Sequence, residues 1–87
     1  MKVHEIAWDQ ASIQHIARHG VDPKEVEDIC FDSMPLIMKT KQNRYFALGQ
    51  TQSGRYLTII LEYLGRHKIK IITARSMSIS ERRLYRR

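Results

Sequence analysis

The chain has 87 residues, of which 43% are hydrophobic and 28% are charged, and its net charge at pH 7 is +6. A chain this short buries only roughly 60–65% of its unfolded surface, so residues 1–87 are expected to form one domain without a separate cofactor domain. No apolar run approaches the ~18 residues of a membrane span, and the first residues lack the apolar core of a signal peptide. A lone cysteine, Cys30, excludes an internal disulfide and a zinc–cysteine cluster. We therefore expect a cytoplasmic protein that makes no membrane contact.

The charge is unevenly distributed along the chain. Through Asp32 there are three Lys/Arg and seven Asp/Glu, a net charge of −4, whereas from Ser33 onward there are twelve and two, a net charge of +10. A half this basic in a small domain is typical of a protein that binds a polyanion. Charge alone does not distinguish RNA, DNA and an acidic protein, and a protein partner that neutralises part of the surface is a second interpretation.

The first predicted elements are a short edge strand over residues 3–7 and a helix. Asp9 is a suitable N-cap because its carboxylate can accept from the free backbone N–H groups of the first helical turn. The helix is expected to run to His19 and to stop at Gly20, a residue type that tolerates the left-handed conformation found after helix ends.

A second helix is predicted from the clearest start signal in the sequence. The run from Asp22 to Glu25 combines an N-cap, a proline at the first helical position and a glutamate that closes a capping box. This helix is expected to end near Asp32.

The periodicity then changes from helical to extended, and a last helix begins at Ser78. Predicted strands cover residues 36–39, 44–50, 55–63 and 68–75, with four-residue turns at 51–54 and 64–67. The predicted fold class is therefore α+β, with two N-terminal helices packed on an antiparallel meander and a C-terminal helix.

The turn lengths predict the strand register and the two faces of the sheet. Without bulges, Tyr56 lies opposite Arg75 and Thr58 opposite Thr73. The apolar face that packs on the helices is then predicted to carry Phe46, Leu48, Leu57, Ile59, Leu61, Ile72 and Ala74. The other face is predicted to be a groove, with Tyr45, Ala47, Gly49, Tyr56, Thr58, Thr73 and Arg75. A one-residue slip would reverse this assignment.

Several familiar kinds of active site are excluded by spacing. His15 and His19 lie one helical turn apart, but no glutamate follows the first histidine and no third ligand is suitably spaced, so a zinc hydrolase is rejected. The glycines are isolated, so no phosphate-binding loop is predicted. Cys30 lies on an apolar helical stripe and is interpreted as a core residue rather than a nucleophile.

Basic side chains are the remaining candidates for function. Arginine suits phosphate because its planar donors contact two oxygens at once. Arg44, Arg55 and Arg75 lie at predicted strand ends, and Lys68 and Lys70 alternate along one strand and point to one face. The last helix carries Arg82, Arg83 and Arg86 around Leu84.

The motifs together resemble the BrnT toxins, small ribonucleases of bacterial type II toxin–antitoxin systems with a RelE-like fold. The matching pieces are Trp8-Asp9, Arg18-His19-Gly20-Val21, Glu25-Val26, Arg44 to Gly49, Gly54-Arg55, Ile69 to Arg75 and Glu81-Arg82-Arg83-x-Tyr85. They span nearly the whole chain. Each piece is weak alone, but their order and spacing are specific.

The resemblance implies an endoribonuclease that uses neither a metal nor an organic cofactor and inhibits translation and growth. It implies Arg75 as phosphate stabiliser, His19 as acid or base, and Tyr85 as a residue that orients substrate or donates a proton. RNA would be held by Arg44, Arg55, Tyr56, Lys68, Lys70, Arg82 and Arg83, of which Tyr56 is selected by the predicted register alone and is not a motif residue.

The resemblance also implies a protein partner. This is a cognate BrnA-like antitoxin with a ribbon–helix–helix DNA-binding domain, which forms a heterotetramer with the toxin. Operator DNA would be contacted only through that antitoxin.

The chain departs from the family pattern at Arg18, where a lysine is usual, and at Asn43, where an acidic residue often stands. Guanidinium does not deprotonate near neutral pH, so Arg18 cannot readily replace a lysine that transfers a proton. A non-catalytic module that binds RNA or antitoxin is therefore the alternative. A DNA-binding regulator is a third interpretation, which the acidic first helices and the short terminal helix disfavour.

Overall fold

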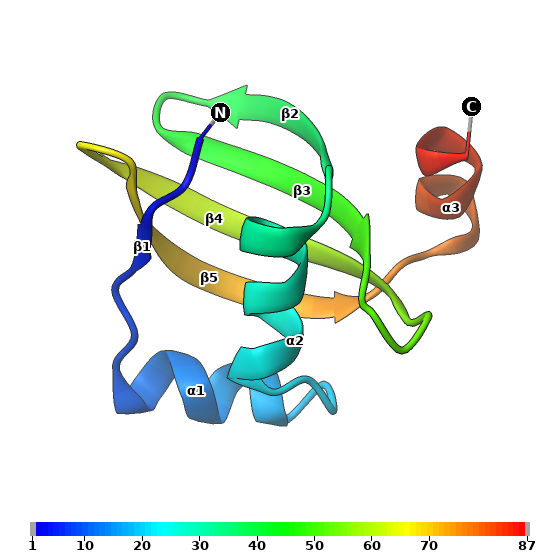
Figure 1. The fold of residues 1–87 in the computed structure, drawn as a ribbon, viewed down its shortest axis with the longest axis horizontal. Helices are drawn as coiled ribbons and strands as arrows, with labels where there is room; N and C mark the ends of the chain where they lie inside the picture. Colours follow the sequence, from blue (N-terminus) through cyan, green and yellow to red (C-terminus); the bar gives the residue numbers. More distant parts are fainter. Residues whose placement is uncertain (1, 87) are drawn as a thin grey trace.

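The computed structural model describes residues 2–86. Five strands form one sheet in the order β1-β5-β4-β3-β2, with bounds β1 Glu5–Ile6, β2 Leu36–Lys41, β3 Arg44–Gln50, β4 Tyr56–Gly65 and β5 Lys68–Ser76. Two helices, α1 (Gln10–Ala17) and α2 (Pro23–Glu27), lie against one face of the sheet, whereas α3 (Ile79–Tyr85) stands apart at the end where β3 and β5 finish (Figure 1). No helix of residues 2–86 is long and apolar enough to cross a membrane.

The predicted α+β class is confirmed, but the sheet is mixed rather than purely antiparallel. β2, β3, β4 and β5 form the antiparallel meander. The N-terminal edge strand pairs with β5 in parallel, with Glu5 beside Lys68 and Ile6 beside Ile69. β1 and β5 are separated along the chain by α1, α2 and the strands β2 to β4. No turn therefore fixes the relative direction of β1 and β5.

All three predicted helix starts are capping boxes. The side chains of Asp9, Asp22 and Ser78 each accept from the backbone N–H three residues later, and the backbone N–H of each cap donates to the side chain at that later position. α1 ends at Ala17, two residues earlier than predicted, and Gly20 follows with φ of +71°. α2 continues as a π-helical segment over Asp28–Asp32, so the two together cover the predicted second helix.

The register between β3 and β4 differs from the prediction by one residue. Thr51 donates its backbone N–H to the carbonyl of Arg55 at 2.9 Å, so the connection has three residues rather than four. Gly54 has φ of +95°, the left-handed conformation that a three-residue hairpin loop requires. Leu48 therefore lies opposite Thr58 instead of Leu57.

This shift reverses the predicted faces of β3. Ala47 and Tyr45 belong to the side that packs on the helices, and Gly49 lies against Ile29. Leu48 is buried on the opposite side with Thr58. The prediction that Phe46 and Leu48 face the helices, with Tyr45, Ala47 and Gly49 in the groove, was wrong.

The register between β4 and β5 differs by two residues near Arg75, which keeps the faces. Arg75 lies opposite Thr58 and Thr73 opposite Ile60. The turn is the pair Arg66 and His67, both with positive φ, rather than the predicted four residues. A bulge at Ile72 then places Ile69 and Ile71 in the core, so the prediction of Ile72 on the core face was wrong.

Candidate active site

An arginine–glutamate pair joins β5 to α3. Arg75 donates from Nη1 to Oε1 of Glu81 at 2.7 Å and from Nη2 to Oε2 at 2.9 Å, a bidentate ion pair. Thr58, directly opposite Arg75 in the sheet and fully buried, donates its hydroxyl to Oε1 of Glu81 at 2.8 Å. The backbone N–H of Ser78 also donates to this oxygen at 2.8 Å. One carboxylate therefore caps α3 and orients the guanidinium.

These contacts determine the charge state of the pair. Hydrogen bonding from Arg75, with further donors at Ser78 and Thr58, lowers the pKa of Glu81 to about 2 from the ordinary value of 4.5. The same hydrogen bond raises the pKa of Arg75. Both groups are ionised throughout the physiological range, and the carboxylate offsets much of the positive charge.

Aromatic and cationic side chains from α3 lie next to this pair. The guanidinium carbon of Arg82 is 4.2 Å from the ring centre of Tyr56, a cation–π contact. The ring of Tyr85 meets that of Tyr56 nearly edge-on, at 6.1 Å and 74°. Arg75, Glu81, Thr58, Tyr56, Arg82 and Tyr85 are called the Arg75 cluster below.

The Arg75 cluster provides the parts of a phosphate and base site. Nη1 of Arg75 also donates to the carbonyl of Ser76 at 3.3 Å, which leaves Nε and one hydrogen of Nη2 for a ligand, and the side chain is 35% exposed. Tyr56 and Tyr85 offer aromatic surface of the kind on which unpaired RNA bases stack. The arrangement therefore suits a single-stranded segment with its phosphate at Arg75.

A histidine pair lies along the outer side of β5. His15 Nε2 is 3.1 Å from Oγ1 of Thr73, and the rings of His15 and His19 are 5.6 Å apart. Thr73 and Arg75 point to the same side of the strand because they are two residues apart. The contact places the exposed imidazole of His15 next to the strand that carries Arg75, and the exposed His19 follows in the turn after α1. Neither ring contacts a member of the Arg75 cluster.

Arg55 is held by contacts of its own. Its Nη1 lies 3.0 Å and 3.1 Å from the two carboxylate oxygens of Glu25, and it also donates to the carbonyl of Gly20 at 2.6 Å. These bonds fasten the β3–β4 connection to the start of α2. Arg55, which was predicted to bind RNA, therefore stabilises the fold through these contacts.

The other predicted RNA-binding residues are spread over the sheet. Arg44 opens β3, four residues or ~13 Å from Leu48, and borders a hollow lined by Lys41, Gln42, Asn43 and Glu62. Lys68 is 3.7 Å from Glu5, and Lys70 is exposed near Asp9. Arg83 is exposed on α3, where it lines a shallow surface with Ile79, Arg82 and Arg86. Of the ten predicted site residues, only Arg75, Tyr85, Tyr56 and Arg82 are brought together.

Sequence reasoning gave no role to Glu81, Thr58 or His15. A signal existed for Glu81, since Ser78 and Glu81 have capping-box spacing, but that pattern does not show that the carboxylate also binds Arg75. The contact of Thr58 with Glu81 depends on the strand register, and the contact of His15 with Thr73 depends on the placement of α1 beside β5. The sequence specifies neither.

We expect Glu81→Gln to lower the free energy of unfolding by roughly 1–3 kcal/mol at pH 7, because a charge-assisted bidentate bond is replaced by a weaker neutral one. The pKa of Glu81 in the folded chain lies below its unfolded value, so its stabilisation is full above about pH 4.5 and is lost as pH falls toward about 2. The difference between wild type and variant should therefore shrink across that window. Urea denaturation followed by circular dichroism at pH 7, 4.5 and 3 measures it, and a pH-independent difference would refute the ion pair's contribution.

Other reactive groups are placed elsewhere. Burial raises the pKa of the Cys30 thiol to about 12, so the neutral thiol predominates near neutral pH. Within residues 2–86, no three His, Cys, Asp or Glu side chains are grouped as in a metal site.

Comparison with known proteins identifies the family. Residues 8–81 match the family described as ribonuclease toxin, BrnT, of type II toxin–antitoxin system. The crystal structure of the Brucella abortus ribonuclease toxin, BrnT, superposes with a TM-score of 0.69 at 27% sequence identity, over 85% of this chain and 96% of that one. No curated protein matches the chain. The family match covers most of the sequence and includes Arg75 and Glu81, so the chain belongs to the BrnT family of type II ribonuclease toxins.

Proposed function

We propose that this chain is an endoribonuclease that cleaves RNA without a metal ion and is neutralised by a cognate antitoxin. Membership of a ribonuclease toxin family supports the activity in general. The observation that carries the proposal for this chain is the bidentate setting of Arg75 beside Tyr56, Arg82 and Tyr85. This geometry provides phosphate charge stabilisation and base stacking on one surface.

The proposed reaction is a transphosphorylation. The ribose 2′-oxygen forms a bond to the adjacent phosphorus while the bond from phosphorus to the 5′-oxygen breaks. A base takes the proton of the 2′-hydroxyl, and an acid gives a proton to the departing 5′-oxygen. The products are a 2′,3′-cyclic phosphate and a 5′-hydroxyl, so no water or metal is consumed in this step.

In this proposal, Arg75 stabilises the negative charge that develops on the phosphate oxygens. Glu81 acts as a positioning residue that holds the guanidinium in one orientation. Arg82 holds a neighbouring phosphate or stacks with a base on Tyr56. Tyr85 donates a proton or orients the substrate. His19, in the turn after α1, is the acid or base candidate, and its ring lies 5.6 Å from that of His15, which contacts Thr73 of β5.

The proposal predicts that purified protein cleaves RNA in the presence of EDTA. The measurement is incubation with single-stranded RNA, followed by mapping of the new ends. New 5′-hydroxyl and 2′,3′-cyclic phosphate ends that form at equal rates with EDTA or Mg²⁺ are the expected result. Cleavage that requires Mg²⁺, or that leaves 5′-phosphate ends, would contradict the proposed chemistry.

A non-catalytic RNA-binding or antitoxin-binding module is the second candidate. Two observations favour it: Arg18 is at the C-cap of α1 where the family usually has a lysine, and Glu81 offsets the charge of Arg75. It predicts salt-dependent RNA binding without new RNA ends. An Arg18→Lys variant that gains cleavage would assign the loss to that position.

The proposed partner is an antitoxin that carries the DNA-binding domain, so that operator DNA is contacted through it in a heterotetramer. Support comes from the family, which is defined within two-component toxin–antitoxin systems. The basic C-terminal two thirds of the chain carry enough positive charge to suit both RNA and an acidic antitoxin segment.

A further inference from the structure

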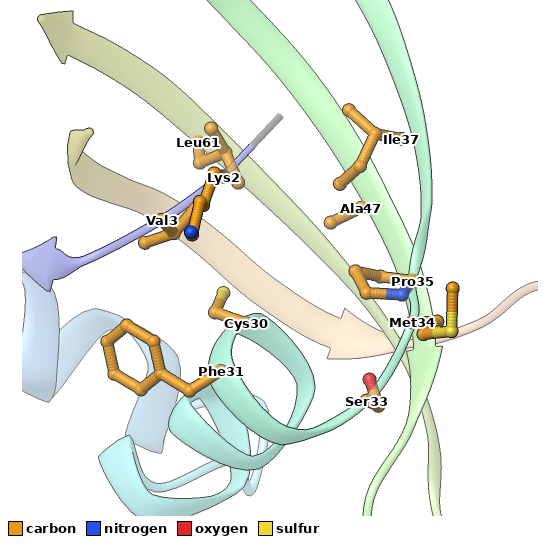
Figure 2. Close-up of a pocket in the computed structure, with 10 residues that line it drawn as sticks. All are labelled: Lys2, Val3, Cys30, Phe31, Ser33, Met34, Pro35, Ile37, Ala47 and Leu61. Atoms are coloured by element: carbon orange, nitrogen blue, oxygen red, sulfur yellow. The ribbon is translucent and has the colours of Figure 1, made fainter. Parts of the chain in front are cut away.

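An apolar hollow lies on the side of the molecule where the core meets the N-terminal segment and the start of β2 (Figure 2). Its volume is about 350 Å³, and Ala47 and Leu61, both almost fully buried, form part of its lining. Cys30 and Ile37 complete the apolar wall. Among residues 2–86, Lys2 and Ser33 contribute the only polar side chains of its lining. A small-molecule site usually has several convergent polar groups that orient the ligand, and this hollow lacks them among the described residues.

The rim of this hollow exposes large apolar side chains. Met34 is 95% exposed and Phe31 is 42% exposed, and both line the hollow within four residues of sequence. Exposed apolar side chains at the mouth of an apolar hollow are typical of an interaction surface.

A free strand edge adjoins the hollow. In the described part of the chain, β2 pairs with β3 alone and is the last strand of the sheet. Its outer edge therefore presents unpaired backbone donors and acceptors, which another chain can extend as an additional strand. Backbone pairing at the edge and an apolar pocket beside it are the two parts of a site for an extended peptide segment.

The positive charge around the hollow and the β2 edge favours an acidic partner segment. Lys39 and Lys41 are exposed on β2, Lys2 lines the hollow, and residues 33–41 contain no acidic residue. A second copy of this chain would bring lysines against lysines, which is unfavourable for directly opposed strand positions. RNA is disfavoured because the hollow is apolar and lacks arginine.

We propose that the hollow and the β2 edge, called the β2 surface here, bind an acidic segment of the cognate antitoxin that adds a strand and inserts a large apolar side chain. This inference rests on the proposed toxin function, because it requires an antitoxin. The β2 surface includes Ala47, on the helix-packed face, whereas the Arg75 cluster lies on the opposite face with Thr58. Antitoxin binding and RNA cleavage should therefore be separable by mutation.

The test uses the full chain and the product of the reading frame that adjoins its gene, co-expressed and then titrated by calorimetry. Met34→Asp should weaken binding at least tenfold, because it places a charge at the apolar rim of the hollow, and Met34 is too exposed to affect folding. Lys39→Glu with Lys41→Glu should slow association and reduce its salt dependence. Free Met34→Asp protein should cleave RNA at the wild-type rate but escape inhibition by the antitoxin.

Ile79→Asp is the matched control, since it introduces the same charge at an apolar residue of α3 that is 74% exposed. Loss of binding in this control, with normal binding by Met34→Asp, would overturn the proposal and move the interface to α3. Failure of the wild-type pair to associate would overturn it as well. A wild-type homodimer that Met34→Asp dissociates would assign the surface to a second copy. Absence of RNA cleavage with normal, Met34-dependent binding would instead refute only the proposed catalysis.

Discussion

Replacing Arg75 with alanine is expected to reduce the rate of RNA cleavage by ~10²-fold or more, the usual cost of removing one group that stabilises charge in a transition state. Arg75 is the member of the Arg75 cluster whose donors are both oriented and partly exposed, through two bonds to Glu81. The measurement is the single-turnover rate on single-stranded RNA in EDTA. Arg86→Ala, at the exposed end of α3, is the matched control and should cleave at the wild-type rate.

A loss of activity could also arise because Arg75→Ala leaves the Glu81 carboxylate without its cation. The double variant Arg75→Ala/Glu81→Gln separates the two explanations, since it removes the unpaired charge together with the guanidinium. If Arg75 acts on the phosphate, the double variant remains inactive while its unfolding free energy recovers relative to Arg75→Ala. Recovery of cleavage in the double variant would show that Arg75 serves only to hold α3.

Arg75→Lys is a further discriminating change because lysine keeps the charge and loses the planar fork. The bidentate bond to Glu81 cannot form with an ammonium group, so the cation is no longer oriented. We expect cleavage to fall nearly as far as with alanine, whereas RNA affinity should fall less. Equal rates for Arg75→Lys and wild type would mean that charge alone is sufficient.

Local features of this fold follow from the sequence, whereas contacts between distant elements do not. Asp9 and Asp22 were predicted as helix caps and Ser78 as the start of the last helix. All three side chains accept the backbone bond of a cap, because a capping box depends on residues within one turn. The parallel pairing of Glu5 with Lys68 joins residues at the two ends of the fold, and no local pattern encodes it.

In the β3–β4 hairpin, a difference of one residue in loop length changes which side chains of β3 face the helices. Gly54 signals a turn under either loop length, and only the Thr51–Arg55 bond makes the connection three residues instead of four. That difference reversed the faces of β3 and removed Tyr45, Ala47 and Gly49 from the predicted groove. β4 kept its predicted faces, with Leu57, Ile59 and Leu61 in the core.

The candidate site was predictable in part for the same reason. Arg75, Arg82 and Tyr85 lie within eleven residues of each other at the junction of β5 and α3, so local structure alone brings them close. Tyr56 joins them because β4 is the neighbour of β5. The hydrogen bonds that Arg75 and Thr58 donate to Glu81 depend on the angle between β5 and α3, which no spacing rule predicts.

Gly49→Ala is expected to destabilise the protein by ~1–3 kcal/mol through overpacking, although Gly49 was first interpreted as a small residue that leaves room for a ligand. A Cβ at position 49 would lie 2.6 Å from Cγ2 and 3.3 Å from Cγ1 of Ile29, which is fully buried in the π-helical segment. The backbone there is ordinary strand, so the cost comes from the clash alone. Urea denaturation followed by circular dichroism measures it.

Ile29→Ala provides the test of that mechanism, because it removes the two carbons closest to the new Cβ and leaves only Cβ of residue 29, at the ordinary contact distance of 3.5 Å. Alone it should cost ~2–5 kcal/mol through the cavity it creates. In Gly49→Ala/Ile29→Ala, the added methyl group enters that cavity, so the double variant should be more stable than the sum of the single effects predicts by ~1 kcal/mol or more. Strict additivity would show that the methyl group at position 49 does not meet Ile29. A positive coupling would show that Gly49 is small because the π-helical segment packs directly on β3, on the face of the sheet opposite the Arg75 cluster.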